Sequence, residues 1–174
     1  MSKIIAKDGE IFEIAGMEFI KFPEVDGKVP VVMKDIAFCS KFGDNNDLRS
    51  STARKRMEKE ILPQIAEVVG KENMCTVYTD LTTLCGLKTY GVMESFISLP
   101  TLDFYRENIE IFDKYKPDTY WWLATPESTK PHDNPYWTLC VSPAGGILID
   151  NDFNCIGVRP FCIFKSSIFE SSEN

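Results

Sequence analysis

The residues best suited to chemistry lie in one short segment, where the only histidine, His132, stands beside Asp133 and Asn134. A histidine next to a carboxylate can act as a general base if a serine or cysteine nucleophile lies within hydrogen-bond reach. Three prolines lie between residues 126 and 135, however, and they predict a stiff, exposed loop. Any serine or cysteine nucleophile would depend on a base carried by this exposed loop, which argues against catalysis. A stiff loop loses little entropy on binding, which favours recognition.

Two aromatic residues, Tyr136 and Trp137, follow this loop and are expected to contact a ligand, although packing within a strand is the alternative. Loops at one end of a sheet converge in space, so the acidic turn at residues 150–154 is expected to form a neighbouring rim. The predicted binding residues are His132, Asp133, Asn134, Tyr136, Trp137, Asp150, Asp152 and Asn154.

No motif in the chain specifies a cofactor or a metal. A Walker loop, GxGxxG and a metal-spaced histidine cluster are all absent from the sequence. Residues 150–154 begin like a calcium loop, but an EF-hand needs glycine at its sixth position and an acidic residue at its twelfth, where this chain has Cys155 and Phe161. Asp and Asn are instead expected to bond their own backbone in a turn. We predict no metal, no cofactor and no enzymatic activity.

Composition and charge exclude several classes of partner. Hydrophobic content of 44% and charged content of 26% are ordinary for a folded chain, and 174 residues fit a single domain, placed at residues 1–165 before a polar tail at 166–174. The net charge of -7 argues against direct nucleic-acid binding, which depends on Lys and Arg neutralising phosphates. No apolar run approaches the roughly 18 residues of a membrane helix, so no membrane partner is expected.

The start of the chain contains no secretory signal, which predicts a protein of the host cytoplasm or of a virion assembled there. The six cysteines form no Cys-x-x-Cys pair and are therefore expected to be buried thiols rather than disulfides. The oligomeric state is left open.

The elements that position these residues follow from local patterns. A hairpin turn is expected at residues 26–27, and a first helix is expected from a cap at residues 50–52 to Gly70, kinked or ended by Pro63. Thr101 is expected to cap a second helix. The first third of the chain favours strands at residues 11–14, 17–22 and 29–33. The pattern as a whole predicts an α+β fold.

The last third of the chain carries an ordered series, in which Trp121 and Trp122 precede Pro126 and a closing Gly-Val-Arg-Pro begins at Gly157. This series resembles the end of C-type-lectin-like domains of bacterial and phage proteins, which read Trp-Trp-Leu-Arg-Ser-Pro and then Gly-Val-Arg-Pro. Similar ends occur in formylglycine-generating enzymes and in variable proteins of diversity-generating retroelements. The resemblance implies a C-type-lectin-like fold with twisted antiparallel sheets and two helices.

The resemblance also implies roles for individual residues. Trp121, Trp122 and Gly157 are expected to be structural, and Arg159 is expected to lie in the core, paired with backbone or carboxylate groups. The family's arginine after Trp-Trp-Leu is replaced by Ala124. The copper-binding cysteine pair of formylglycine-generating enzymes has no match here.

Two functional hypotheses remain. The first is a non-enzymatic recognition module that binds a protein or a glycan, for example as a phage adhesion component. The alternative is an acidic intracellular phage protein that inhibits a host defence protein. The fold itself carries both binding proteins and enzymes and does not decide between them.

Overall fold

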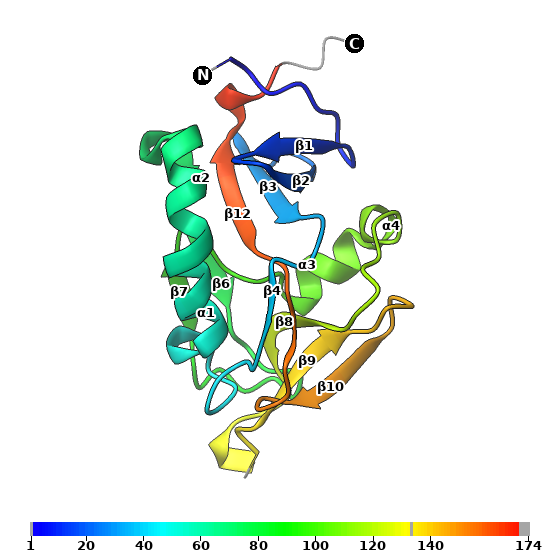
Figure 1. Ribbon diagram of the computed structural model, residues 1–174. Coiled ribbons are helices and arrows are strands. Elements are labelled where there is room, and N and C mark those ends of the chain that lie inside the picture. The colour runs from blue at the N-terminus through cyan, green and yellow to red at the C-terminus, as the bar shows by residue number, and fades with distance from the viewer. Residues whose placement is uncertain (1, 133, 171–174) are drawn as a thin grey trace.

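A computed structural model describes residues 2–132 and 134–170, and Asp133 of the predicted binding set therefore lies outside the described residues. One five-stranded sheet has the order β1-β2-β3-β12-β5 (Figure 1). Every strand pair in it is antiparallel, and its last strand in sequence, β12, lies between two early ones. Its strands are β1 (Ile11–Ile14), β2 (Met17–Lys21), β3 (Lys28–Met33), β5 (Met74–Cys75) and β12 (Phe161–Lys165).

The second five-stranded sheet has the order β10-β9-β8-β11-β4, and a separate hairpin is made by β6 and β7. Within this sheet only the β11–β8 pair is parallel. The α+β class with mostly antiparallel sheets is thus confirmed. The strands are β4 (Phe38–Ser40), β6 (Val77–Asp80), β7 (Val92–Ser95), β8 (Trp121–Pro126), β9 (Trp137–Val141), β10 (Ile147–Asn151) and β11 (Ile156–Val158).

The first helix runs as α1 (Thr52–Arg56), a π-helical turn η2 (Met57–Ile61) and α2 (Leu62–Val69). Its predicted cap is confirmed, because the Ser51 hydroxyl accepts a hydrogen bond from the Arg54 N–H. Pro63 does not end this helix, which continues to Val69. The π-helical turn lies just before the proline, and in it the Leu62 N–H bonds to the Met57 carbonyl, five residues back. This wider turn replaces the regular α-helical hydrogen bonds at the point where the proline ring would clash with a backbone carbonyl. The helix ends at Gly70, at a positive φ of 84°.

The second predicted helix is two helices, α3 (Leu102–Glu107) and α4 (Ile109–Phe112). The expected count of two helices is therefore wrong, and the described residues form three. The break lies at Asn108, whose φ of -120° and ψ of 26° leave the helical region. Its side-chain amide donates to the Phe104 carbonyl, a local bond that competes with the helical ladder. Short turns complete the elements: η1 (Leu48–Ser50), η3 (Lys71–Asn73), η4 (Lys130–His132) and η5 (Ser166–Ile168).

Strand β8 separates two hydrophobic cores. Successive side chains of a strand point to opposite faces, and Trp122 accordingly packs in the core beneath the long helix while Trp121 packs in the core beneath α3 and α4. Both tryptophans are fully buried, and the Trp122 indole N–H donates to the Ser40 carbonyl at 3.0 Å. Each tryptophan therefore faces a core, on opposite sides of β8.

Arg159 lies in the core, as expected, between β11 and β12. Its guanidinium donates to the carbonyls of Met33 at 3.0 Å and Lys34 at 2.9 Å, and it lies 4.7 Å from the centre of the Trp121 ring. Burial lowers the pKa of Arg159 to about 10, which still leaves the group charged at neutral pH. The side chain therefore joins β3 to the closing strands.

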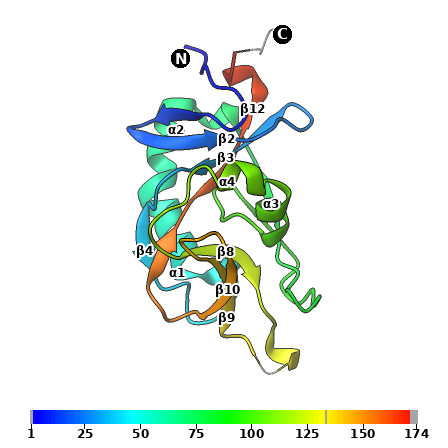
Figure 2. The same ribbon diagram turned by 90° about the vertical axis from the view of Figure 1, so that its right-hand side faces the viewer.

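The polar tail begins later than residue 166. Ile168 and Phe169 are buried, and Ile4 N–H donates to the Ile168 carbonyl while Glu170 N–H donates to the Ile4 carbonyl. The first and last described segments therefore lie side by side, at the end of the molecule away from the yellow proline-rich loop (Figures 1 and 2). Within residues 2–132 and 134–170, no helix is long and apolar enough to cross a bilayer.

Candidate functional site

An open pocket of about 510 Å³ lies where three segments far apart in sequence meet, namely the turn at residues 44–47, the loop at residues 89–90 and the proline-rich loop. Its volume falls within the range of small-molecule sites. We call it the tyrosine pocket, and its lining residues are Asp44, Asn45, Thr89, Tyr90, Lys130, Pro135 and Tyr136.

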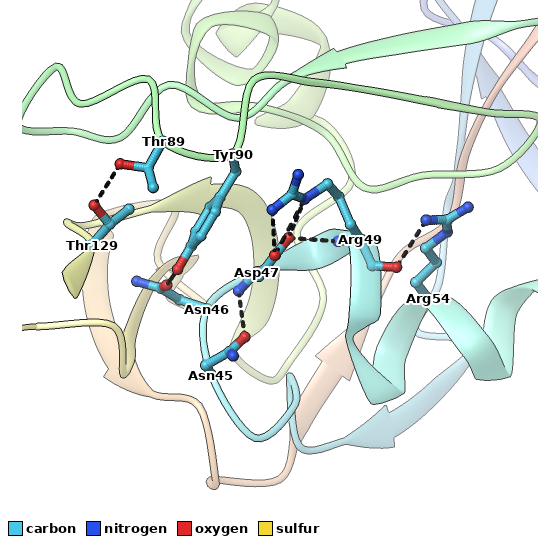
Figure 3. A network of polar contacts seen from close by, with 8 residues as sticks. All are labelled: Asn45, Asn46, Asp47, Arg49, Arg54, Thr89, Tyr90 and Thr129. Atoms are coloured by element: carbon cyan, nitrogen blue, oxygen red, sulfur yellow. Dashed lines mark hydrogen bonds and ion pairs between the residues drawn. The ribbon is translucent and has the colours of Figure 1, made fainter.

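Asn46 joins these three segments, and Figure 3 shows its contact with Tyr90. The side chain is completely buried, and its amide N–H groups donate to the carbonyls of Ser128 at 2.7 Å and Trp137 at 3.1 Å. Its amide oxygen accepts a hydrogen bond from the Tyr90 hydroxyl at 2.7 Å. One fully satisfied buried amide thus fixes the position of a pocket tyrosine relative to the proline-rich loop.

Arg49 supports Tyr90 from the other side. The guanidinium lies 5.3 Å from the centre of the Tyr90 ring and is itself held by a two-pronged contact with the Asp47 carboxylate (Figure 3). Burial, with a smaller contribution from Asp47, raises the pKa of Tyr90 to about 12. The ring is therefore a neutral, preoriented surface at physiological pH.

The proline-rich loop is anchored at its start and exposed at its tip. Thr129 is completely buried and its hydroxyl bonds to that of Thr89 at 2.8 Å. Asn134 donates from its amide to the Glu127 carboxylate at 2.7 Å. The turn η4, which contains His132, projects from the end of the molecule (Figure 1). The loop is thus partly exposed, as predicted, but its first residues belong to the buried polar network.

The predicted aromatic pair divides into an exposed and a half-buried residue. Tyr136 is 47% exposed, lines the pocket and stacks on Phe153 with ring centres 6.4 Å apart. Trp137 is only half-buried, at the start of β9. The contact between Tyr136 and Phe153 brings the proline-rich loop and the 150–154 turn together, as expected for one face.

Asp152 corrects the expected acidic rim. It is completely buried, and its Oδ1 accepts a hydrogen bond from the Thr138 hydroxyl at 2.6 Å. Burial, with a smaller contribution from Asp150, raises the pKa of Asp152 to about 7. The Asn154 amide donates to the Asp150 carboxylate in the turn that the sequence predicted, and of the three acidic-rim residues only Asn154 is exposed. Asp152 is therefore structural and not a surface contact.

The cysteines also differ from expectation. All six thiols are free, but Cys39, Cys85 and Cys155 are exposed rather than buried. Cys140 and Cys162 are buried, and burial raises the pKa of each to about 12. None of the six lines the tyrosine pocket.

The pocket offers hydrogen bonds and aromatic surface rather than an acid–base pair. Among its described lining residues, the ionisable groups are Asp44, Lys130 and the two tyrosines. The hydrogen bond from Lys41 lowers the pKa of Asp44, which makes its carboxylate a weak base at neutral pH. No group of three or more His, Cys, Asp or Glu side chains suited to a metal ion occurs in the described part of the chain.

The sequence predicted Tyr136 but not Asn46, Thr89 or Tyr90. The polar run at residues 43–47 was recognisable only as a turn, because its role depends on partners 82 and 91 positions away. Comparison with protein-family models, with curated proteins and with solved structures found no match to this chain.

Proposed function

We propose that the protein is a non-enzymatic recognition module of C-type-lectin-like fold, and that it binds a glycan in the tyrosine pocket. The fold assignment is supported by the paired tryptophans of β8 and by Arg159, which lies against Trp121. The glycan assignment is supported by one observation above all: two tyrosine rings line a small open pocket together with an amide and a hydroxyl.

The chemistry of this lining suits a sugar. The apolar C–H face of a pyranose ring packs on an aromatic ring, and the exposed Tyr136 offers such a surface. The Asn45 amide N–H groups can donate hydrogen bonds to sugar hydroxyls, and the Thr89 hydroxyl can form a further hydrogen bond beside the one that it shares with Thr129. Tyr90 is held by Asn46 and Arg49 before any ligand arrives, so little entropy is lost at that ring.

A recognition role also agrees better with the ionisable groups than an enzymatic role does. A glycosidase needs two carboxyl groups, one of them with a raised pKa, on either side of the bond to be cleaved. The described lining contains one carboxylate, Asp44, and its pKa is lowered. Binding without turnover is therefore the proposal.

The test is a glycan array probed with the labelled protein and with Tyr136→Ala, using Tyr78→Ala as the matched control. Tyr78 is an exposed tyrosine of β6, outside the pocket. We expect a defined set of glycans to bind the wild type and the control, and loss of the Tyr136 ring to weaken binding at least about tenfold. Absence of binding to any glycan, or equal binding by all three proteins, would refute the proposal.

A further inference from the structure

Strand β10 lies at the outer edge of its sheet and carries three consecutive exposed apolar residues. Ile147, Leu148 and Ile149 are 38%, 47% and 44% exposed. In the sheet order, β10 has β9 on one side and no described strand on the other (Figure 1). Edge strands are commonly protected by charges, prolines or bulges, because an unprotected edge pairs with other strands. None of these three residues supplies such protection.

The register shows which backbone groups of β10 point outward. The Gly146 carbonyl accepts from Ser142 N–H, and Asp152 N–H donates to the Tyr136 carbonyl. Both pairs belong to the register that sets Leu148 opposite Cys140. Because bonded and non-bonded residues alternate in an antiparallel pair, the N–H and C=O groups of Ile147 and Ile149 point away from β9.

We propose that β10 pairs antiparallel with β10 of a second copy of this chain, about a twofold axis at Leu148. In this register Ile147 of each copy lies opposite Ile149 of the other, and all four outward groups of each copy are bonded. Two five-stranded sheets then become one continuous sheet. The four isoleucines pack on one face and the two copies of Leu148 meet on the other.

Neighbouring registers are less complete. A register shifted toward the C-terminus would need the outward backbone groups of Asn151. Its N–H already donates to the Asp150 carboxylate, and its carbonyl accepts from the Asn154 N–H. A register shifted toward the N-terminus would need the backbone groups of Gly145. Its N–H already donates to the Ser142 carbonyl, and its carbonyl accepts from the Tyr105 hydroxyl. The register centred on Leu148 is the one in which no bonded group must be released.

Charge complementarity also favours a second copy. The twofold register sets Asp150 opposite Gly146 of the second copy, so no like charges face each other. A Cβ atom on Gly145, the neighbouring residue, would lie 3.6 Å from Cδ of Lys116. The half-exposed Lys116, whose Nζ lies 3.8 Å from the Asp113 carboxylate of its own copy, therefore lies near the end of the ladder that Asp150 of the other copy approaches.

The dimer is expected to be weak. Six apolar side chains and a short ladder cover less than the roughly 800 Å² per partner of a standard interface. Each copy also carries a net charge of -7, so the two copies repel each other at long range. Added salt screens this repulsion, and dimerisation should therefore strengthen with ionic strength.

Sedimentation equilibrium tests the association. The wild-type mass should rise from 19.8 kDa toward twice that value between micromolar and near-millimolar concentration. Ile149→Pro removes one outward N–H without touching the β9 ladder and should raise the dimer dissociation constant at least about tenfold. Val92→Lys, at an exposed position of β7, should match the wild type, whereas Ile149→Lys should not dimerise. A monomer at all concentrations, or equal dimerisation of Ile149→Pro and wild type, overturns the proposal.

Disulfide trapping tests the register in a background of Cys39→Ser, Cys85→Ser, Cys155→Ser and Cys140→Ala, which removes the exposed thiols and the buried thiol opposite Leu148. Leu148→Cys lies on the twofold axis and should cross-link to itself rapidly under mild oxidation. Ile149→Cys should not, because its two copies are offset by two residues, beyond the roughly 7 Å between Cα atoms that a disulfide spans. Equal cross-linking of the two variants contradicts this register. The outcome is independent of glycan binding, because neither residue lines the tyrosine pocket.

Discussion

Some polar residues that sequence patterns place at the surface are buried instead and support the fold. Asp152 is the clearest case, because its Oδ2 has no hydrogen-bond partner among the described residues while Oδ1 is bonded by Thr138. With its pKa raised to about 7, the carboxyl group holds its proton in the folded state up to neutral pH. A buried acid of this kind couples folding to pH.

The sign of this coupling follows from the raised pKa. Between pH 3.8, the unfolded pKa of Asp152, and about pH 7, the folded state keeps a proton that the unfolded state has lost. The free energy of unfolding therefore falls as pH rises through this range. Asp152→Asn does not titrate. We expect wild-type stability, relative to this variant, to fall by about 2–3 kcal/mol from about pH 5 to about pH 8. Urea unfolding at both pH values measures it, and a constant difference would contradict the assignment.

The control for this experiment is Asp103→Asn, because Asp103 has an exposed side chain. An exposed carboxylate is largely solvated in both states, so this variant controls for the loss of one negative charge.

Arg159 is expected to be the most sensitive charged residue. Arg159→Ala leaves two backbone carbonyls without their donor and opens space beside Trp121. We expect a loss of about 3 kcal/mol in the free energy of unfolding. Arg106→Ala, which removes an exposed arginine paired with Asp103, should cost less than about 0.5 kcal/mol. Equal melting temperatures for Arg159→Ala and wild type would show that the buried contacts are not needed.

At the level of elements, the closing Gly-Val-Arg-Pro motif acts through close packing of β11 between β8 and β4. A Cβ atom at Gly157 would lie 2.6 Å from Cδ1 of Ile36 and 2.9 Å from the Tyr120 carbonyl oxygen. The backbone oxygen cannot move aside without disturbing the bond that it accepts from Gly157 N–H. Glycine is therefore required here for space rather than for backbone freedom.

Gly157→Ala is accordingly expected to cost about 1–3 kcal/mol in the free energy of unfolding, by overpacking. Gly146→Ala is the control, because the nearest atom to its added methyl group would be the Ser142 hydroxyl oxygen at 3.4 Å. Thermal and urea unfolding of both variants decide the matter. A Gly157→Ala protein as stable as Gly146→Ala would mean that β11 can shift without penalty.

Local patterns predicted the elements better than their partners. The first strands and the Ser51 cap were recognisable because alternation and capping act over a few residues. The position of β12 between β3 and β5, and of β11 between β8 and β4, results from long-range packing that leaves no local signal. The same limit explains the site: Tyr136 follows a recognisable loop, whereas Asn46 acts through contacts between distant segments.

At the scale of the whole molecule, the two proposed surfaces belong to the same sheet. The tyrosine pocket lies where Tyr136 leads into β9, and the edge that we propose for dimerisation is β10, paired to β9. A dimer would therefore carry two glycan pockets on one continuous sheet. Two linked sites bind a multivalent surface more tightly than one site binds a single glycan, provided that the geometry allows both to engage.

The central claim is that a glycan binds in the tyrosine pocket, and NMR chemical-shift mapping tests it most directly. A glycan selected on the array is titrated into isotope-labelled protein, and backbone amide shifts are followed. We expect the largest saturable changes at Asn45, Thr89, Tyr90, Lys130 and Tyr136. Changes that cluster instead at the smaller cavity of about 220 Å³ beside α3, or along β10, would contradict the account.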